Sequence, residues 1–212
     1  MAPAPPAPFV VLASRSPQRK AILRQLGVPF RVVPSWHAES LAPGAPVNTV
    51  IDNALGKARV VAGREAAGLA PGHLILGVDT VVVLDERVMG KAATAAEATA
   101  FVTALSGRRH EVESGICLVA PGGGVWTGHA RTVVTFRSLA PEAVASYVAT
   151  QEWRERAGAY AIQGVGSALV TAVEGDYWNV VGLPVALLLD GFEQLGVAPF
   201  SWLCGAGRRS RR

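Results

Sequence analysis

The sequence predicts an α/β fold with a mixed, partly antiparallel sheet flanked by helices. In the first half, short apolar runs alternate with helical patterns, which is typical of strand–helix units with parallel strands. Later, two apolar runs at 111–119 and 126–137 flank Pro121–Gly124, which indicates an antiparallel hairpin. With 212 residues, half of them hydrophobic and only 17% charged, the chain is globular and long enough to bury a sizeable core.

Capping residues and apolar periodicity locate the individual elements. Pro17 suits the first position of a helix that Gly27 ends, and Asn48 can cap a second helix. Thr94 and Glu97 have the spacing of a capping box, which predicts a third helix. The expected strands are 10–13, 30–33, 74–84, 111–119, 126–137 and 169–173. The expected helices are 17–26, 48–61, 95–105, 141–150 and 183–195.

The chain is expected to hold one domain, 9–198, between a flexible N-terminal segment, 1–8, and a basic tail without fixed structure, 199–212. Residues 1–8 are mainly alanine and proline with no basic region, unlike a signal peptide. The apolar run 180–189 contains a glycine and a proline and is too short to span a bilayer. These features predict no membrane association.

The positive charge of the chain is concentrated at its C-terminus. The formal net charge is +4, but the last five residues include Arg208, Arg209, Arg211 and Arg212. Without them the domain is close to neutral, so the charge is weak evidence for a nucleic-acid partner. Cys117 and Cys204 lie far apart with no metal-binding or redox spacing, which fits a cytoplasmic protein in a reducing compartment.

The junction between the first strand and the first helix predicts an anion site. Ser14 and Ser16 stand just before Pro17, where the free N–H groups of a helix N-terminus attract anions. Arg15, Arg19 and Lys20 add positive charge there. Bound phosphate is one interpretation, and a serine-capped surface helix with solvated arginines is the other.

Asp79 lies in the middle of the apolar run 74–83, where aspartate is disfavoured as a strand former. A buried carboxylate without a partner costs free energy or shifts its pKa, so it requires a reason. Gly77, two residues earlier on the same face, leaves room for a close approach. We interpret Asp79 as a catalytic base or metal ligand that faces a cleft. The alternative is a structural aspartate paired with a nearby basic group.

Lysine is rare in this chain, which otherwise uses arginine. Of 20 basic residues, only Lys20, Lys57 and Lys91 are lysines. A lysine ammonium is compact and can approach a phosphate where a guanidinium does not fit, so these lysines are candidates for substrate contacts. Glu39, in the loop after the second strand, is a candidate Mg²⁺ ligand or an ordinary solvated glutamate.

Several segments occur in the order and spacing of a known family. They are Leu12–Arg19, Ala54–Ala58, Gly77–Thr80, Gly90–Lys91, Leu105–Gly107, Ala157–Gly164 and Val180–Pro184. On these motifs the chain resembles the Maf family of nucleoside triphosphate pyrophosphatases, from about Val10 to Leu195. Each motif alone is weak evidence, whereas their shared order is specific.

The resemblance implies a Maf-like catalytic domain of inosine triphosphatase-like (Maf/Ham1-like) architecture, with two lobes around a cleft. It also implies hydrolysis of nucleoside triphosphates between the α- and β-phosphates, with a divalent metal cation, Mg²⁺ or Mn²⁺. Asp79 would then accept the proton of the attacking water. Glu39 and Asp79 would be candidate metal ligands. The residues that would hold the phosphates are Ser14, Arg19, Lys57 and Lys91.

The resemblance also bears on the base of the substrate. Residues 160–164 resemble the branch that prefers dTTP and UTP, and Thr80 and Gln163 occupy positions associated with base selectivity there. Gln18 stands where that branch places arginine and a 7-methyl-GTP branch often has tryptophan. Ala38 stands where an acidic residue is common, which weakens a two-carboxylate metal site. We expect a house-cleaning pyrophosphatase with a preference for pyrimidines.

A function of a different class remains open. Maf-like proteins have been linked to septum formation and the arrest of cell division, so a nucleotide-sensing regulatory protein is the alternative. The set of Ser14, Arg19, Lys57, Asp79 and Lys91 is intact, which favours catalysis. The sequence leaves open whether the protein is a monomer or a homodimer.

Overall fold

The computed structural model describes residues 9–40, 44–65, 69–70 and 72–206. In chain order the elements are β1 (Phe9–Leu12), α1 (Pro17–Gln25), β2 (Phe30–Val32), α2 (Pro46–Glu65), β3 (His73–Leu84), β4 (Arg87–Met89), α3 (Ala95–Leu105), β5 (Arg109–Val119), β6 (Val125–Phe136), α4 (Pro141–Ala149), the 3₁₀ helix η2 (Gly164–Leu169), β7 (Val170–Glu174), α5 (Tyr177–Val181), α6 (Val185–Gln194) and α7 (Ser201–Ala206).

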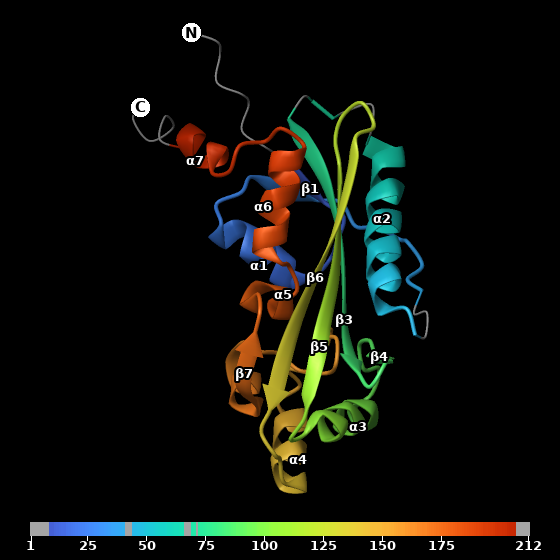
Figure 1. Cartoon of the computed structure of the whole chain (residues 1–212), viewed down its shortest axis with the longest axis vertical. Helices are drawn as coiled ribbons and strands as arrows, with labels where there is room; N and C mark the ends of the chain where they lie inside the picture. The colour runs from blue at the N-terminus through green and yellow to red at the C-terminus, as the bar shows by residue number, and fades with distance from the viewer. Residues whose placement is uncertain (1–8, 41–43, 66–68, 71, 207–212) are drawn as a thin grey trace.

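The strands form one mixed sheet in the order β2-β1-β3-β5-β6-β7, with β4 also paired to β3. β1 pairs in parallel with β2 and β3, whereas β3, β5, β6 and β7 pair antiparallel in turn. Helix α2 covers one face, while α1, α5 and α6 cover the other and α3 and α4 lie at one end (Figure 1). The predicted mixed, partly antiparallel sheet flanked by helices is therefore confirmed.

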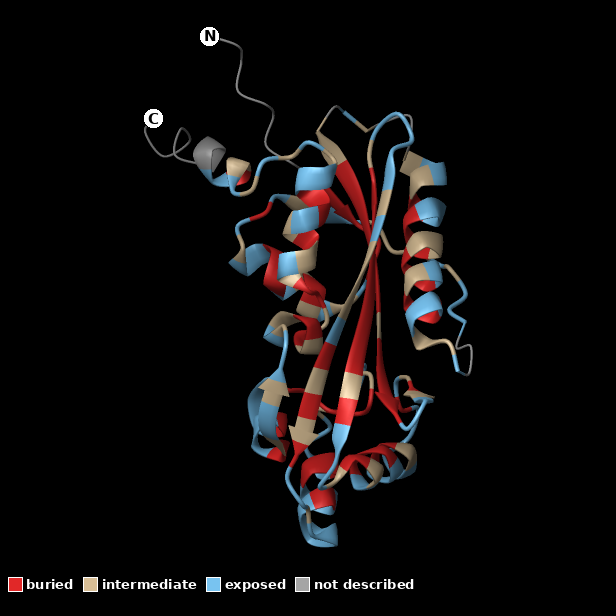
Figure 2. Ribbon diagram, viewed as in Figure 1, coloured by how far each residue is buried: buried red, intermediate tan, exposed pale blue. Residues whose placement is uncertain are grey.

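Strand β3 is buried on both faces, as its continuous apolar run predicts. Leu74, Leu76 and Val78 belong to the larger core, between the sheet and the helices of the α1 face. Ile75 belongs to the smaller core beneath α2, together with Ala54 of that helix. Figure 2 shows this buried layer along most of β3 and β5. The alternation places Gly77 and Asp79 on the face that α2 covers.

Helix α2 packs directly on the sheet because two strands carry glycines beneath it. A Cβ atom at Gly77 would overlap the carbonyl oxygen of Ala54, and one at Gly115 would overlap that of Val50. Since Gly77 and Gly115 lie on the adjacent strands β3 and β5, they form a flat seat for the helix. The close approach that Gly77 permits is therefore made by α2.

Several elements differ from the sequence-based expectation. Helix α2 begins at Pro46, before the expected cap at Asn48, and α6 begins after Pro184. Strand β4, η2 and α5 are additional; each is too short to leave a clear periodic pattern. The helix predicted after Thr94 is present, and the Thr94 hydroxyl accepts a hydrogen bond from the Glu97 N–H at 3.1 Å.

The prediction of a tail without fixed structure from residue 199 is corrected at its start. Helix α7 begins at Ser201, and Trp202 is buried in the larger core. The Trp202 indole N–H donates a hydrogen bond to the Leu26 carbonyl at 2.8 Å. Burial of this large ring and its satisfied N–H hold the segment on the domain. Residues 1–8 and 207–212, on which the rest of the terminal predictions fall, lie outside the described residues.

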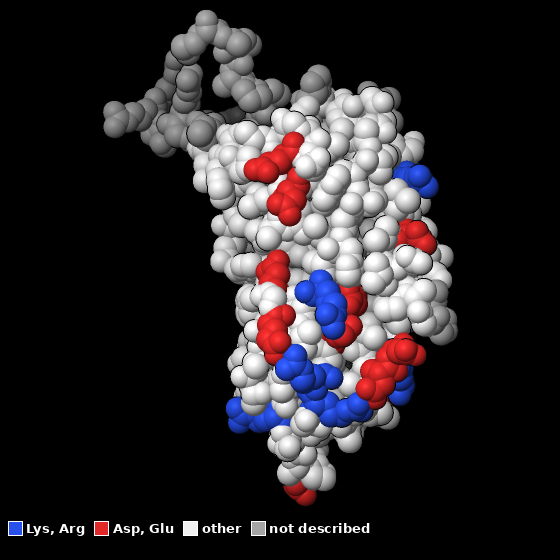
Figure 3. Space-filling view, viewed as in Figure 1, with Lys and Arg blue, Asp and Glu red and all other residues white. Residues whose placement is uncertain are grey.

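Charged side chains on the viewed face mix both signs. Figure 3 shows acidic and basic groups next to one another over its lower half. An ion pair links Arg131 of β6 to Glu111 of the neighbouring strand β5, and another links Arg109 of β5 to Glu174 of β7, with β6 between them. Such a face lacks the single-sign stripe of a nucleic-acid footprint. Within the described ranges, no helix is both long and apolar enough to cross a membrane.

The seat of α2 gives a first testable prediction. Replacing Gly77 with alanine should lower the free energy of unfolding by about 1–3 kcal/mol, because the added methyl group must push α2 from the sheet. Urea unfolding measures the change. Gly63→Ala is the matched control, since a Cβ atom there meets nothing within 4 Å. It should be neutral or stabilise the helix by up to about 1 kcal/mol. Equal stability of both variants would contradict the proposed seat.

Candidate active site

A pocket opens at a break in the strand pairing along one edge of β3. Strand β1 pairs with β3 only as far as Leu76, and β4 pairs with it only from Val82. Because β5 occupies the other edge of β3, β1 and β4 must share this one. Between Leu76 and Val82, none of the described strands pairs with this edge. A cavity of about 870 Å³ lies here, at the carboxyl end of β1, the usual place for ligands in α/β sheets.

Most of the residues predicted from the sequence meet in this pocket. Its walls come from the loop before α1, from α2 and β3, and from several loops. The predicted residues that line it are Ser14, Gln18, Arg19, Glu39, Lys57, Asp79, Thr80 and Lys91. Gln163 and Lys20 are the exceptions, because neither is among the lining residues. Gln163 is exposed and precedes η2.

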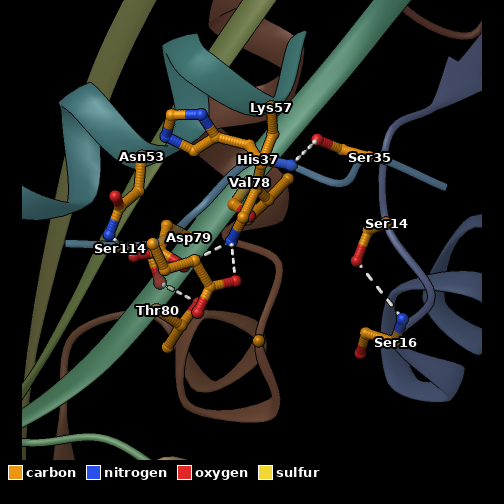
Figure 4. Close-up of polar contacts among 12 residues, drawn as sticks. Ser14, Ser16, Ser35, His37, Asn53, Lys57, Val78, Asp79, Thr80 and Ser114 are labelled. Atoms are coloured by element: carbon orange, nitrogen blue, oxygen red, sulfur yellow. Dashed lines mark hydrogen bonds and ion pairs between the residues drawn. The ribbon is translucent and has the colours of Figure 1, made fainter. Parts of the chain in front are cut away.

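Lys57 lies between two carboxylates at the centre of the pocket. Its Nζ atom is 2.6 Å from Asp79 Oδ1 and 2.7 Å from Glu39 Oε1. Figure 4 shows Lys57 reaching from α2 to Asp79 on β3. Lys57 and Asp79 are buried, whereas Glu39 is half exposed. The sequence analysis offered two interpretations of Asp79, a functional group that faces a cleft or a structural aspartate paired with a basic group. The structure shows both the cleft and the pairing.

The amide of Asn53 fixes the second oxygen of Asp79, a role that the sequence analysis missed. Asn53 Nδ2 donates hydrogen bonds to Asp79 Oδ2 and to the Ser40 carbonyl, both at 2.9 Å. Its Oδ1 accepts from the Ser40 N–H at 2.9 Å. The side chain therefore orients Asp79 and anchors the loop that carries Glu39. The available signal was its spacing: Asn53 and Lys57 are one turn apart on an otherwise apolar helix face.

Arg19 is a buried cation whose hydrogen bonds go to neutral acceptors. Its Nε, Nη1 and Nη2 atoms donate to the Gly182 carbonyl at 2.9 Å, Ser14 Oγ at 3.0 Å and Thr80 Oγ1 at 3.2 Å. Burial lowers the pKa of Arg19, and the charges of Asp79 and Glu39 oppose this effect. No carboxylate among the described residues forms a salt bridge with it. A buried, fixed guanidinium that is not paired with a carboxylate favours the binding of an anion.

The N-terminus of α1 adds to the positive character of this wall. Ser16 caps the helix and Pro17 occupies its first turn, as the sequence predicts. Ser14 Oγ accepts a hydrogen bond from the Ser16 N–H at 3.2 Å. Figure 4 shows Ser14 and Ser16 on the side of the site opposite Lys57. The helix dipole and its first N–H groups thus face the same pocket as Arg19.

Lys91 and Glu155 form an exposed ion pair at the rim. Their Nζ and Oε2 atoms are 2.8 Å apart, and this hydrogen bond lowers the pKa of Glu155. Both line the pocket, together with Arg156. The sequence analysis found Lys91 by its rarity but gave no reason to select Glu155 or Arg156, because charged loop residues carry no distinctive local signal.

Three carboxylates line the pocket: Glu39 and Asp79 both contact Lys57 at its centre, and Glu155 is paired with Lys91 at the exposed rim. Burial raises the pKa of Glu39, but the charges of Lys57, Lys91 and Arg19 outweigh it and the net shift is downward, so the group is ionised at neutral pH. Among the described residues, no three His, Cys, Asp or Glu side chains are grouped for a metal. Two carboxylate donors fit Mg²⁺, which commonly completes its shell with substrate phosphates and water.

Comparison with known proteins identifies the relatives of this chain. Residues 9–195 match the family model described as "Maf-like protein". A dTTP/UTP pyrophosphatase from Moorella thermoacetica is 49% identical over 193 residues, covering 89% of this chain and 95% of the relative. A dTTP/UTP pyrophosphatase from Deinococcus radiodurans is 42% identical over 198 residues, covering 93% of this chain and 98% of the relative. A crystal structure of a nucleoside-triphosphatase, dITP/XTP pyrophosphatase, from Mycobacterium abscessus matches with 17% identity and a TM-score of 0.44. The match covers 89% of this chain and 97% of the crystallised chain.

The buried and exposed ion pairs should differ sharply in their effect on stability. Lys57→Met should lower the free energy of unfolding by about 3 kcal/mol, because it leaves the buried Asp79 carboxylate without its cation. Lys91→Met is the matched control: its pair with Glu155 is exposed, so less than about 1 kcal/mol should be lost. Urea denaturation of both variants at pH 7 compares them. Similar, small losses would show that water already solvates Asp79.

Proposed function

We propose that this chain, which belongs to the Maf family, hydrolyses nucleoside triphosphates to a nucleoside monophosphate and pyrophosphate. The observation that supports this most directly is the centre formed by Asp79, Lys57 and Glu39, which faces a helix N-terminus and the buried Arg19 across one pocket. Such a site combines a base with fixed cations where negative charge develops. The names of the curated relatives point to the same activity.

In this proposal the phosphate chain binds along the α1 side of the pocket. Arg19, the first N–H groups of α1 and the Ser14 hydroxyl offer positive charge and donors there. Lys91 reaches the phosphates from the opposite rim once it leaves Glu155. Because Arg19, Ser14 and the N-terminus of α1 are anchored before substrate arrives, they stabilise the growing charge on the bridging oxygen with little rearrangement, and of the phosphate-binding groups only Lys91 has to move.

Asp79 is the proposed proton acceptor. A water molecule attacks the α-phosphorus, its proton passes to a carboxylate oxygen of Asp79, and the bond from the α-phosphorus to the bridging oxygen breaks. Pyrophosphate leaves with that oxygen. The hydrogen bond from Asn53 and the ion pair with Lys57 hold the carboxylate in a fixed orientation toward the water.

Glu39 and Asp79 would hold the divalent cation, with Mg²⁺ or Mn²⁺ as the proposed ions. When bound, the metal would supply charge neutralisation for the phosphates and the departing pyrophosphate. Ala38 adds no donor, so this chain would bind the metal mainly together with the substrate. The protein groups that position the phosphates and accept the proton are those described above.

The proposed substrates are pyrimidine nucleotides, with dTTP and UTP first. This preference rests on the names of the relatives and on the resemblance at residues 160–164. Thr80 and Gln18 line the pocket and remain proposed contacts for the substrate. Gln163 has the weakest support among them, because it is exposed and away from the lining residues.

We also propose that the enzyme works in the cytoplasm, where its substrates are made. Whether it forms a homodimer stays open, and the absence of a nucleic-acid partner stays a prediction. Cys117 is a free, buried thiol whose pKa is raised to about 11 by burial, which makes it unreactive.

No observation favours the regulatory alternative over catalysis. Purified protein incubated with a panel of NTPs, dNTPs and modified nucleotides with Mg²⁺ or Mn²⁺ tests the proposal by release of pyrophosphate. Binding without any turnover would favour the regulatory function.

Replacing Asp79 with asparagine should remove most turnover while the triphosphate still binds. Loss of a general base typically costs about 10²–10⁴-fold, so kcat should fall in that range. Pyrophosphate release measures kcat, and calorimetry measures binding. Asp85→Asn is the control, because this aspartate pairs with Arg108 at an exposed turn outside the pocket. A near-normal kcat in the Asp79 variant would remove this residue from the mechanism.

Replacing Gln18 with arginine should narrow the range of bases toward pyrimidines. An amide both donates and accepts, whereas a guanidinium only donates, so the change alters which base edges can be satisfied. We expect about 1–3 kcal/mol of added discrimination if the contact forms. The measurement compares kcat/KM for dTTP, UTP, CTP, GTP and 7-methyl-GTP. Gln25→Arg, an exposed change on the same helix, controls for charge. An unchanged ranking would mean that residue 18 does not contact the base.

A further inference from the structure

Trp36 is an exposed indole at the rim of the pocket. It is 71% exposed, the highest fraction among the large apolar side chains that the structure describes. It also lines the pocket, beside the segment that carries Glu39. The mechanism proposed above gives it no role, because it offers neither charge nor an acceptor. A large exposed ring at the mouth of a ligand site calls for a function.

The neighbours of Trp36 are fixed to the protein. The His37 N–H donates a hydrogen bond to Ser35 Oγ at 3.1 Å. The His37 ring lies against Gly56 of α2, where a Cβ atom would overlap it. Figure 4 shows Ser35 and His37 close to Lys57. The position of the indole at the rim therefore follows from an anchored backbone and from the packing of the loop on α2.

Arg15 covers the Trp36 ring with its guanidinium. The Arg15 Cζ atom is 5.0 Å from the ring centroid, within the range of a cation–π contact. Arg15 comes from the loop before α1, so this contact joins the phosphate side of the pocket to the loop of Glu39. Because most of the indole surface stays exposed, the ring keeps a face for another planar group.

Two of the polar groups proposed to contact the base already take part in hydrogen bonds within the protein. The Gln18 Oε1 atom accepts from the Ser16 hydroxyl at 2.8 Å. The Thr80 hydroxyl is shared between Arg19, at 3.2 Å, and Ser114, at 2.8 Å. Gln163 is not among the lining residues. We therefore expect affinity for the base to have a source in addition to these side chains.

We propose that Trp36 stacks on the nucleobase of the substrate, with Arg15 on the edge or the other face of the indole. This inference rests on the proposed function, because it assigns the base to one end of the pocket and the phosphates to the other. Stacking uses the flat face that every base has, so it depends little on which base the nucleotide carries. Trp36 thus supplies affinity for any nucleotide, and selectivity is left to hydrogen-bonding groups such as Gln18.

The test separates base binding from phosphate binding. Calorimetry with Mg²⁺ measures the Kd of an α,β-imido analogue of dUTP, which cannot be cleaved at the α–β bridge, and of inorganic triphosphate, which has no base. We expect Trp36→Ala to raise the Kd of the analogue about tenfold or more, within the range found when stacking residues are removed. The Kd of inorganic triphosphate should not change. Trp36→Phe should restore most of the affinity, whereas Trp36→Leu should not.

Phe200→Ala is the matched control, because Phe200 is an aromatic residue that is 54% exposed and lies outside the pocket lining. An unchanged Kd for the analogue in Trp36→Ala would overturn the inference. Equal weakening of analogue and triphosphate would also overturn it, since Trp36 would then act by placing the Glu39 loop. If the wild-type protein binds the analogue through Trp36 but releases no pyrophosphate from dTTP or UTP, the proposed function fails while the stacking site stands.

Discussion

The direct packing of α2 on Gly77 and Gly115 is the constraint on which the candidate site depends. A side chain at either glycine would overlap the helix backbone, so the two glycines set how closely α2 lies on β3 and β5. At that spacing the short amide of Asn53 and the ammonium of Lys57 both reach Asp79. If the helix stood off by the width of a methyl group, Asn53 in particular could not keep its hydrogen bond, because its side chain has no length to spare.

The charges at the centre of the pocket are balanced in the free protein, while its whole lining has more cations than carboxylates and remains useful to an anion. Asp79 and Glu39 are matched by Lys57 and Arg19, which limits the cost of burying these groups. The two signs are nevertheless separated: both carboxylates meet Lys57, whereas Arg19 lies with the N-terminus of α1. A metal added on the carboxylate side and a phosphate on the other would each find opposite charge, so a metal–nucleotide complex fits the pocket better than either part alone.

The sequence predicted best those residues that break a local rule. Asp79 interrupts an apolar strand and Lys57 and Lys91 are rare lysines, and all three line the pocket. Asn53 was missed although it lies one turn before Lys57, because its partner Asp79 could not be identified until the partner strand was known. Gly77 was noticed, but its neighbour could not be identified from the sequence, since the approach of α2 is a tertiary contact. The short elements β4 and α5 depend on pairing and packing with distant segments, which periodicity does not report.

The break in pairing along β3 explains how two adjacent residues can serve one pocket. Successive side chains of a strand point to opposite faces, so Asp79 faces α2 while Thr80 faces Arg19 and Ser114. Inside a continuous sheet the neighbouring strand would separate two such groups. Here β1 has already ended and β4 has not begun, so a ligand can lie across the open edge and meet both faces. The loop before α1 approaches this edge from one face and the loop of Glu39 from the other, and the contact between Arg15 and Trp36 joins these two loops at the rim.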